Sequence, residues 1–259
     1  MPAISEANRE AQATWNNRAC GQRDDFDLRY KTIAARRYGE DDTWVPGVLD
    51  FPSMRGKHVL EIGHGMGCDL TTAALNGAVA YGIDLTPNHH EIAKRTLDDA
   101  GVSAELHLGN AGELPFESES IDIVYSLGVL HHTDNIEQCI SEAHRVLRPG
   151  GTFIMSLYHF WSVHHLWLMV LSTKNGNLRR LGYRNLLSTV EAGADGVNIK
   201  PLVRLNSQRS TRKLLANFSR AETKICGNTH RIITTLLPRT AADQIEKHWG
   251  WYVVARCTK

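Results

Sequence analysis

The sequence contains few of the features that mark secreted, zinc-stabilised or membrane-spanning proteins. Its five cysteines are scattered, odd in number and without a C-x-x-C pair. We therefore expect neither a disulfide framework nor a structural zinc site. The longest apolar-leaning run, Phe160 to Leu171, is too short to span a bilayer, and the polar N-terminal residues lack the apolar segment of a signal peptide. These absences predict a soluble, cytoplasmic protein.

A regular alternation of short apolar segments and amphipathic segments begins after Pro52. The apolar segments predict strands at residues 58–62, 79–83, 105–108, 121–125 and 152–157. Strands that alternate with helices in this way form βαβ units and a largely parallel sheet. The sequence therefore predicts an α/β fold, in which one helix begins at Pro87 with Thr86 as its N-cap.

The pattern divides the chain into four regions. We expect an N-terminal helical cap at residues 1–50, a core at 51–158, an inserted helical lid at 159–217 and C-terminal strands at 218–259. The lid assignment rests on a less regular, helix-like pattern, and the last assignment on the β-rich run that ends the chain. No internal repeat is present, so we predict one domain with a cap and a lid, and not two independent folds.

A glycine-rich turn follows the first predicted strand, where Gly63, Gly65 and Gly67 come directly before a helical segment. Glycine lets the backbone turn tightly and approach a ligand closely, because a Cβ atom would collide with that ligand. The turn alone is compatible with NAD, FAD, S-adenosylmethionine (SAM) or no ligand. Asp84 ends the second strand 21 residues after Gly63, where its carboxylate can accept both hydroxyls of a ribose. Such an Asp can also cap the next helix, but Thr86 is better placed for that role.

Five stretches of the predicted core carry a resemblance to one family. They are VLEIGHGMG (59–67), GIDL (82–85), GNAGELPF (109–116), SLGVLHH (126–132) and RVLRPGG (145–151). In this order and spacing they resemble the class I SAM-dependent methyltransferases, in the branch related to ubiquinone and menaquinone methyltransferases. The resemblance covers roughly residues 57–158. It implies a Rossmann-like, doubly wound, mostly parallel seven-stranded sheet and SAM as the cofactor.

The resemblance also implies a set of cofactor-binding positions. They are Glu61, Gly63, His64, Gly65, Gly67, Asp84, Leu85, Asn110, Ala111, Leu127, Tyr30 and Tyr38. Glu61 and the glycines would surround the methionine part of SAM, and Asp84 would hold its ribose. Family members usually have Asp at position 110, and Asn110 keeps one oxygen that accepts from the adenine amine. Tyr30 and Tyr38 either close over SAM from the N-terminal cap or serve as packing aromatics.

Methyl transfer from a sulfonium is an in-line substitution whose leaving group is already activated, so alignment supplies much of the acceleration. A general base is a further possibility, and side chains at the carboxyl ends of the fourth and fifth strands are candidates: His131, His132 and Tyr158. Alternatively, the two histidines shape the methionine pocket and Tyr158 lines the acceptor pocket. His164 and His165 lack a third ligand at a suitable spacing, so no metal site is predicted.

Residues 160–240 carry 13 Lys/Arg and 3 Asp/Glu, a net charge of +10, whereas the rest of the chain has a net charge of −9. This stretch is either a solvated helical face or a field that attracts an anionic acceptor with an apolar body. It contains no recognisable nucleic-acid-binding module. The sequence thus predicts a SAM-dependent methyltransferase that acts on an O, N or C atom of a small molecule. The alternatives are a SAM-fold enzyme that catalyses cyclisation or elimination, and a non-catalytic SAM-binding protein.

Overall fold

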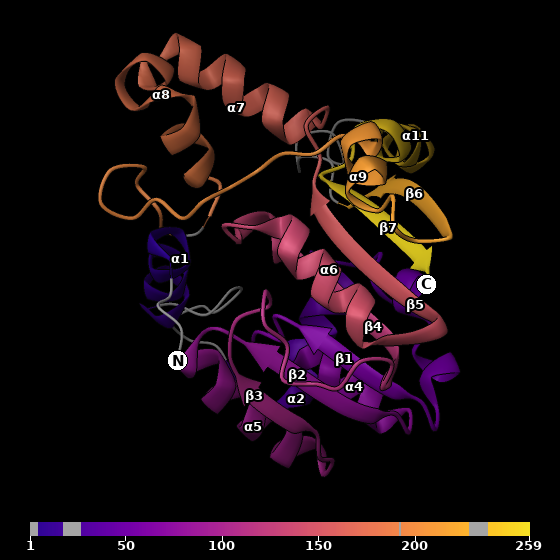
Figure 1. The fold of residues 1–259 in the computed structure, drawn as a ribbon. Helices are drawn as coiled ribbons and strands as arrows, with labels where there is room; N and C mark the ends of the chain where they lie inside the picture. Colours follow the sequence, from indigo (N-terminus) through magenta and orange to yellow (C-terminus); the bar gives the residue numbers. More distant parts are fainter. Residues whose placement is uncertain (1–4, 18–26, 192, 228–237) are drawn as a thin grey trace.

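The computed structural model describes residues 5–17, 27–191, 193–227 and 238–259, and Cys20 lies outside these ranges. Its centre is a seven-stranded sheet in the order β3-β2-β1-β4-β5-β7-β6 (Figure 1). The strands are β1 (His58–Ile62), β2 (Val79–Asp84), β3 (Glu105–Leu108), β4 (Ile121–Leu127), β5 (Leu147–Tyr158), β6 (Arg220–Cys226) and β7 (Tyr252–Thr258). Strands β1 to β5 are parallel, and β7 lies antiparallel between β5 and β6. The predicted Rossmann-like, mostly parallel sheet is confirmed.

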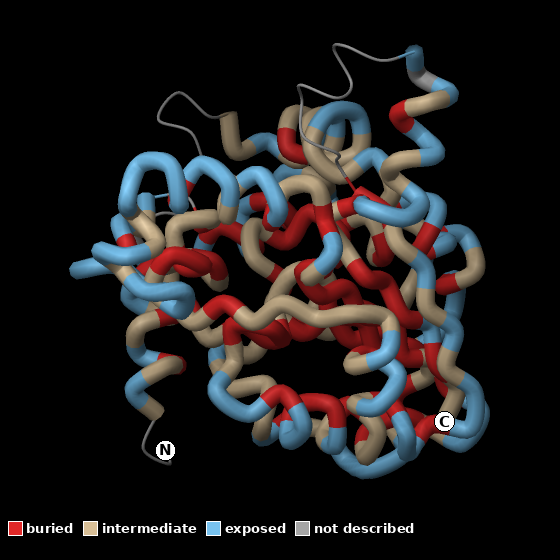
Figure 2. The backbone as a smooth tube through the Cα atoms, turned by 90° about the horizontal axis from the view of Figure 1, so that it is seen from above, coloured by how far each residue is buried: buried red, intermediate tan, exposed pale blue. Residues whose placement is uncertain are grey.

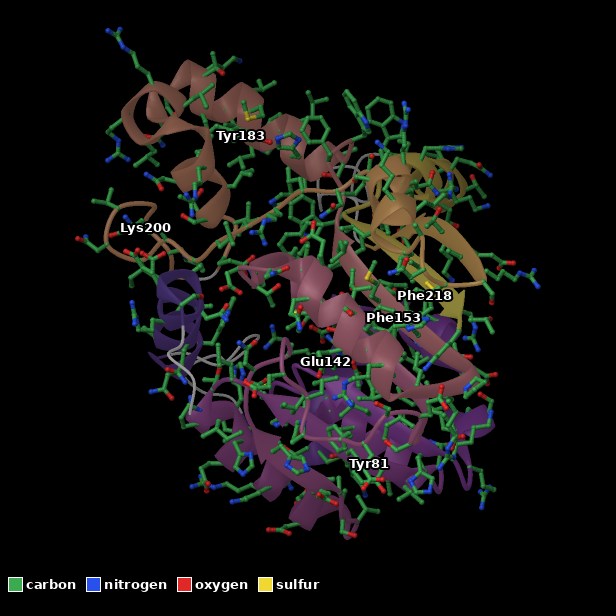
Figure 3. All side chains as sticks on the ribbon, viewed as in Figure 1. Tyr81, Glu142, Phe153, Tyr183, Lys200 and Phe218 are labelled. Carbon is green, nitrogen blue, oxygen red and sulfur yellow. The ribbon has the colours of Figure 1, made fainter. Side chains whose placement is uncertain are left out.

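The strands are apolar on both sides because helices cover both faces of the sheet, as is usual for parallel sheets. Successive side chains of β5 point to opposite faces: Phe153 packs in the same core as Ile140, whereas Ile154 packs in a second core with Ala73. The ring of Phe153 also stacks on Phe218, with centroids 5.6 Å apart (Figure 3). Figure 2 shows these buried strands at the centre, with exposed residues around them.

The helices lie before the sheet or between its strands, where βαβ units occur as predicted between β1 and β2, β2 and β3, and β4 and β5. They are α1 (Glu6–Asn17), α2 (Tyr30–Arg36), α3 (Pro46–Leu49), α4 (Cys68–Leu75), α5 (Pro87–Ala100), α6 (Ile136–Val146), α7 (Val163–Lys174), α8 (Asn177–Ser188), α9 (Gln208–Leu214) and α11 (Arg239–Trp249). Short π and 3-10 turns occur at Arg37–Asp41, Phe51–Met54 and Leu130–His132. No helix in the described ranges is long and apolar enough to cross a membrane.

The start of α5 differs from the sequence-based prediction in one respect. Thr86 occupies the N-cap position, but its side chain makes no capping hydrogen bond. Instead, the backbone N–H of Thr86 donates to Oδ1 of Asp84 at 2.8 Å. The carboxylate of Asp84 therefore holds the N-cap residue in place, while Thr86 keeps the predicted N-cap position without a side-chain capping bond.

Between β5 and β6 the chain leaves the sheet. Helices α7 and α8 pack on each other and extend away from the sheet as an arm, whereas α9 returns to pack on β6 and β7 (Figure 1). A pocket between α8 and α1 is lined by residues that include Glu6, Glu10, Arg184 and Lys200, which places the arm next to the N-terminal helix. The arm, α1 and the carboxyl ends of the strands thus lie on one side of the molecule.

Candidate active site

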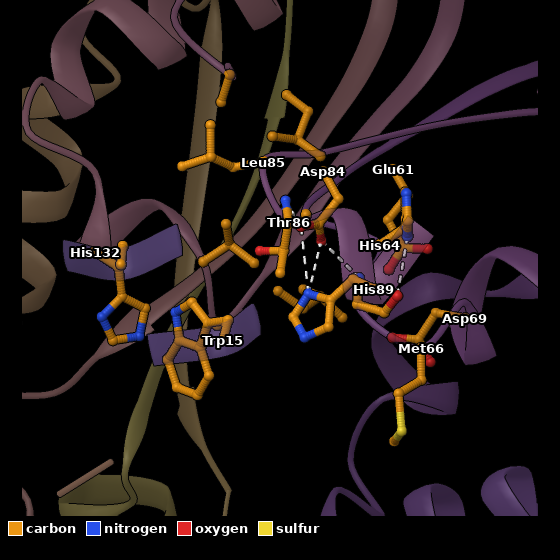
Figure 4. Close-up of a pocket in the computed structure, with 18 of the residues that line it drawn as sticks. Trp15, Glu61, His64, Met66, Asp69, Asp84, Leu85, Thr86, His89 and His132 are labelled. Carbon is orange, nitrogen blue, oxygen red and sulfur yellow. Dashed lines mark hydrogen bonds and ion pairs between the residues drawn. The ribbon is translucent and has the colours of Figure 1, made fainter. Parts of the chain in front are cut away.

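A cavity of about 440 Å³ lies at the carboxyl ends of the parallel strands. Its lining includes residues that end or directly follow β1, β2, β3, β4 and β5, together with residues of α1. Because chain connections leave β1 and β4 in opposite directions, this is the topological switch point at which open α/β sheets bind ligands. Figure 4 shows the side chains that converge there.

The glycine-rich turn after β1 forms one wall of the cavity, and two of its glycines are sterically required. Gly67 has a φ of +79°, and a Cβ atom there would lie 2.9 Å from the Cβ atom of Ala93. Gly63 has a φ of +78°, and a Cβ atom there would overlap the side chain of Val129. Because the backbone is left-handed and closely packed at both positions, any other residue there would cost stability. The turn therefore brings its backbone to the cavity while α4 and α5 stay in contact.

Asp84 lies beside this turn and is almost fully buried. Its Oδ2 accepts from the backbone N–H of Gly65 at 2.9 Å, its Oδ1 from Thr86, and His89 Nδ1 lies 3.3 Å from both oxygens (Figure 4). Burial alone would raise the pKa of this carboxyl, but the His89 and Gly65 contacts lower it well below its usual range. Asp84 is therefore a fixed negative charge with free lone pairs remaining toward the cavity.

Glu61 lies at the other side of the turn. Its Oε2 accepts a hydrogen bond from the Tyr125 hydroxyl at 3.1 Å, and among the described residues no cationic side chain bonds it directly. Burial, with a contribution from nearby Asp69, raises the pKa of Glu61 well above its usual range. A cationic ligand would relieve this cost, because an opposite charge favours the ionised form. Glu61 is thus suited to an ammonium group.

The carboxylate of Asp69, next to Glu61, is held by the protein itself. Arg37 donates to its two oxygens at 2.8 and 2.6 Å, and the Tyr38 hydroxyl donates at 2.8 Å. The Tyr38 and Tyr30 hydroxyls also lie 2.7 and 3.0 Å from Oγ1 of Thr72. Neither tyrosine is among the residues that line the cavity. Of the two roles that the sequence offered, these contacts favour packing: both hydroxyls contact Thr72 of α4, and this anchors the N-terminal segment beside the cavity wall.

The remaining cofactor positions line the cavity as a group. They are His64, Leu85, Asn110, Ala111 and Leu127. The Asn110 side-chain oxygen accepts from the backbone N–H of Gly112 at 3.0 Å, which fixes the amide and leaves one lone pair on that oxygen. Burial lowers the pKa of His64, so its imidazole is neutral near pH 7.

The other end of the cavity is lined by aromatic side chains and three hydrogen-bonded polar groups. The aromatics are Trp15, Trp251 and Tyr252. The polar groups are His132, Tyr158 and Glu191. The Tyr158 hydroxyl donates to Oε1 of Glu191 at 2.9 Å, and Nε2 of His132 lies 3.6 Å from the same oxygen. Nδ1 of His132 is 2.7 Å from the carbonyl oxygen of Leu202 and donates to it, which leaves Nε2 as the lone-pair nitrogen.

His131 behaves differently from His132. Its side chain is completely buried, it does not line the cavity, and neither ring nitrogen has a hydrogen-bond partner within the described ranges. The ring packs against those of Tyr158 and His132, with centroids 3.9 and 4.1 Å away. Burial lowers the pKa of His131 well below its usual range. His131 was one of the candidates for a general base. Because its side chain does not reach the cavity, the structure does not support that role.

Glu191 is the site residue that the sequence did not identify. It follows α8 in the inserted region, in a segment without a recognisable motif. Its carboxylate, His131 and His132 each offer one donor atom, and these three atoms lie within 4.8 Å of one another. The sequence-based prediction of no metal site concerned His164 and His165, and Nδ1 of His165 bonds the Phe160 carbonyl oxygen at 2.7 Å. The donor set found here is a different one. The sequence pointed to its two histidines but not to Glu191.

Comparison with known proteins identifies the core. Residues 60–155 match the model of a methyltransferase domain family. A phthiotriol/phenolphthiotriol dimycocerosates methyltransferase of Mycobacterium leprae is 36% identical over 101 residues, which are 38% of this chain and 37% of that protein. A sterol 4-C-methyltransferase of Caenorhabditis elegans is 29% identical over 42% of this chain and 37% of its own length. The chain thus matches less than half the length of these two relatives.

Solved structures share the whole fold at low sequence identity. Geranyl diphosphate C-methyltransferase from Streptomyces coelicolor, solved with Mg²⁺, geranyl diphosphate and S-adenosylhomocysteine, has a TM-score of 0.64 at 13% identity, over 100% of this chain and 99% of that chain. Magnesium protoporphyrin IX methyltransferase from Synechocystis has a TM-score of 0.61 at 15% identity, over 98% of this chain and all of its own. Residues 60–155 are thus similar to methyltransferase domains, and the whole chain has the fold of solved methyltransferases that were crystallised with the product of SAM.

Proposed function

We propose that this chain catalyses methyl transfer from SAM to an ionisable oxygen or nitrogen atom of a small, largely apolar acceptor. The observation that carries the proposal is one cavity with two chemically different ends. Glu61 and Asp84 lie at one end, and His132, Tyr158 and Glu191 lie at the other. A methyl donor and an acceptor held at these two ends would meet in the middle, and such alignment is the main source of acceleration for this substitution.

The cofactor end provides a complementary group for each part of SAM. The carboxylate of Glu61, which no cationic side chain bonds directly in the described ranges, would bind the amino group of the methionine part, and the fixed charge of Asp84 would accept from the ribose hydroxyls. Leu85 would pack on the adenine, whose edge Asn110 and Ala111 would read. The glycines and His64 would surround the methionine carboxylate, and Leu127 would lie near the sulfonium. The roles of Leu85, Asn110 and Ala111 follow the family resemblance, and the others are part of this proposal.

The acceptor end favours an apolar body with a polar reacting group. Trp15, Trp251 and Tyr252 supply aromatic surface, and Glu191 supplies a negative charge or a hydrogen-bond acceptor. None of the described Lys or Arg residues in 160–240 lines the cavity. The two arginines that do line it, Arg36 and Arg37, are paired with Asp41, Asp42 and Asp69. The basic stretch therefore offers an anionic head group no partner in the cavity, which argues against the anionic acceptor. One named relative is a sterol methyltransferase, and a sterol is largely apolar.

The non-methylating alternatives are not favoured, because the matched family and the named relatives are methyltransferases.

The proposed methyl transfer is tested by the transfer of label from methyl-labelled SAM to a panel of apolar phenols and amines. The panel includes counterparts whose reacting atom is already methylated and counterparts that carry an added carboxylate. We expect label only in compounds with a free O–H or N–H, and less in the carboxylated ones.

Matched variants connect the transfer to the cavity. Glu191→Gln should lower the turnover number, whereas Glu246→Gln should not, because Glu246 lies outside the cavity and bonds the Gly227 backbone. Glu61→Gln should raise the dissociation constant for SAM. Tight SAM binding without label transfer to any compound of the panel or of a host extract would reject the proposal and favour cyclisation, elimination or a binding role.

A further inference from the structure

We propose that His131, His132 and Glu191 form a binding site for a divalent transition-metal ion at the acceptor end of the cavity. Three donor atoms, one from each residue, lie within 4.8 Å of one another, and all three residues are buried. Ligand atoms 2.0–2.2 Å from a common ion are separated by less than this, so small side-chain rotations would suffice. The binding site stands on these residues alone, whereas its catalytic role rests on the function proposed above.

The first argument is the state of His131. Both of its ring nitrogens are buried without a partner among the described residues, although buried polar atoms are normally hydrogen-bonded. A metal ion would give one of these nitrogens a strong partner.

The second argument is the set of hydrogen bonds behind the donors. Metal-binding histidines usually donate their other ring N–H to a carbonyl or carboxylate, which fixes the ring and the tautomer. Nδ1 of His132 donates in this way to Leu202, so its Nε2 lone pair is free for an ion. Metal-binding carboxylates are also held by hydrogen bonds, and Glu191 accepts from Tyr158. Two of the three donors are therefore already oriented.

The donor set indicates the class of metal. Two imidazoles and one carboxylate suit Zn²⁺, Fe²⁺, Co²⁺ or Mn²⁺ better than Mg²⁺ or Ca²⁺, which prefer oxygen ligands. Three protein ligands leave at least one position open, as in catalytic sites. His132 and Glu191 line the cavity, so an open position would face the acceptor and not the protein interior.

An acceptor oxygen or nitrogen bound at that position would lose its proton more readily, because the cation stabilises the deprotonated atom. The proton would pass to solvent. The lone pair of the metal-bound atom would then attack the methyl carbon of SAM, and the electrons of the breaking C–S bond would move to sulfur. The products are the methylated acceptor and S-adenosylhomocysteine. In this arrangement Tyr158 is a positioning residue that holds the carboxylate of Glu191.

The test begins with metal binding to the full chain, stripped with EDTA and dialysed against buffered Zn²⁺ or Co²⁺. Elemental analysis should give one ion per chain, and bound Co²⁺ should show the visible bands of a site with four or five ligands. Glu191→Gln keeps an oxygen for Tyr158 and should weaken Zn²⁺ binding at least about tenfold. His131→Ala should do the same. His107→Ala is the matched control, because His107 pairs with Glu105 at 2.8 Å on the surface.

The outcomes separate the site from the proposed function. Zn²⁺ binding that is absent, or unchanged in Glu191→Gln, overturns the site. Methyl transfer that survives EDTA at full rate overturns the catalytic role of the ion, while methyl transfer itself stands and the cluster acts without metal. One tightly bound ion, lost in both site variants and kept in His107→Ala, supports the site even if no acceptor is methylated.

A different observation carries a second inference, about the arm formed by α7 and α8. The outward side of α7 is apolar: Leu166 is 54% exposed, and Val170 and Leu171 are each 41% exposed. Trp161, just before α7, is 63% exposed. The polar His165 and Ser172 are the buried residues of this helix. This distribution is the reverse of an ordinary surface helix, whose polar residues face water.

The charge of the arm is one-sided. Residues 160–190 contain Lys174, Arg179, Arg180 and Arg184 and no Asp or Glu. Exposed Trp and Leu side chains next to Lys and Arg are the composition of segments that lie in the interface of anionic membranes. We infer that the arm docks on the surface of an anionic bilayer. An apolar acceptor dissolved in that bilayer would then reach the cavity beside the arm, in which Tyr183 of α8 is labelled in Figure 3.

The test is co-sedimentation with vesicles of phosphatidylcholine, with and without half phosphatidylglycerol. We expect binding to the anionic vesicles only, and its loss in a Leu166→Glu/Leu171→Glu double variant. Leu75→Glu/Val79→Glu is the matched control, because those residues are 45% and 44% exposed elsewhere on the surface. Equal binding to both vesicle types, no binding, or a dimer in solution that the arm variant dissociates would overturn the inference.

Discussion

The most informative single change is Asp84→Asn, because it removes a charge while keeping the size of the side chain. Each oxygen of Asp84 accepts one backbone N–H, from Gly65 and from Thr86. An asparagine has one oxygen, so one of these buried amides would face an NH₂ group. Leaving a buried donor unsatisfied costs about 1–3 kcal/mol, which sets the expected loss in the free energy of unfolding.

The loss in cofactor affinity follows from the same geometry. A hydrogen bond to a charged acceptor contributes about 1.5–3 kcal/mol, and Asp84→Asn would remove one ribose bond and weaken the other. A combined loss of about 2–3 kcal/mol raises the dissociation constant for SAM about 30- to 140-fold. Titration calorimetry measures this change, and urea denaturation measures the stability of the same samples.

Asp122→Asn is the matched control. Asp122 also accepts a backbone N–H, from His58, and pairs with Arg148, but it lies at the opposite end of the strands. We expect it to lower stability without changing SAM affinity.

The pH dependence of stability gives a further check on Asp84. The pKa of Asp84 in the folded protein is below its usual value, so the unaltered protein should be more stable than Asp84→Asn above about pH 4, and this difference should shrink as the pH falls further. SAM affinity within threefold of the unaltered protein in Asp84→Asn would refute the ribose assignment.

Three further predictions test the walls of the cavity. Arg37→Met leaves the buried carboxylate of Asp69 without its cation and should cost about 3–5 kcal/mol in urea denaturation; a cost under about 1 kcal/mol contradicts the pairing. Gly67→Ala forces a Cβ atom against Ala93 and should cost about 1–3 kcal/mol and weaken SAM binding in calorimetry. Burial raises the pKa of the four described thiols to about 11 or 12, so a Cys20→Ser variant should show no thiol reactive with Ellman's reagent at pH 8 until guanidinium unfolds it.

The sheet was predictable because its sequence signals are local. Each parallel strand is a short apolar run bounded by a turn, and helix–strand alternation leaves few topologies to consider. The turn at Gly63 was equally readable, since positive φ and close packing require glycine there. The hydrogen bond from the Thr86 backbone N–H to Asp84 could not be predicted in the same way. It depends on the direction of the Asp84 side chain at the strand end, which a sequence pattern leaves open.

The cofactor end and the acceptor end differ in predictability for a physical reason. The candidate cofactor positions that line the cavity lie at or directly after the ends of strands that the sequence predicts, so their places relative to the strand ends could be read from the sequence. The acceptor end is built from segments far apart in the sequence. His132 and Glu191 approach to 3.6 Å only because the arm returns past β5 before α9 begins. No periodicity links these positions, and the glutamate lies in no motif.

The roles of the two tyrosines in the N-terminal segment, Tyr30 and Tyr38, also could not be decided from the sequence. A tyrosine near a predicted site is compatible with contact to ligand or to protein, and hydrogen-bond partners decide between them. Tyr38 bonds Asp69, whose other partner is Arg37, so the ring belongs to an ion-pair network behind the wall. That network keeps Asp69 paired while Glu61, in the same buried region, lacks a direct cationic partner among the described residues. The contrast between these two carboxylates, one neutralised by the protein and one left for a ligand, is the strongest electrostatic argument that the cavity receives a cation.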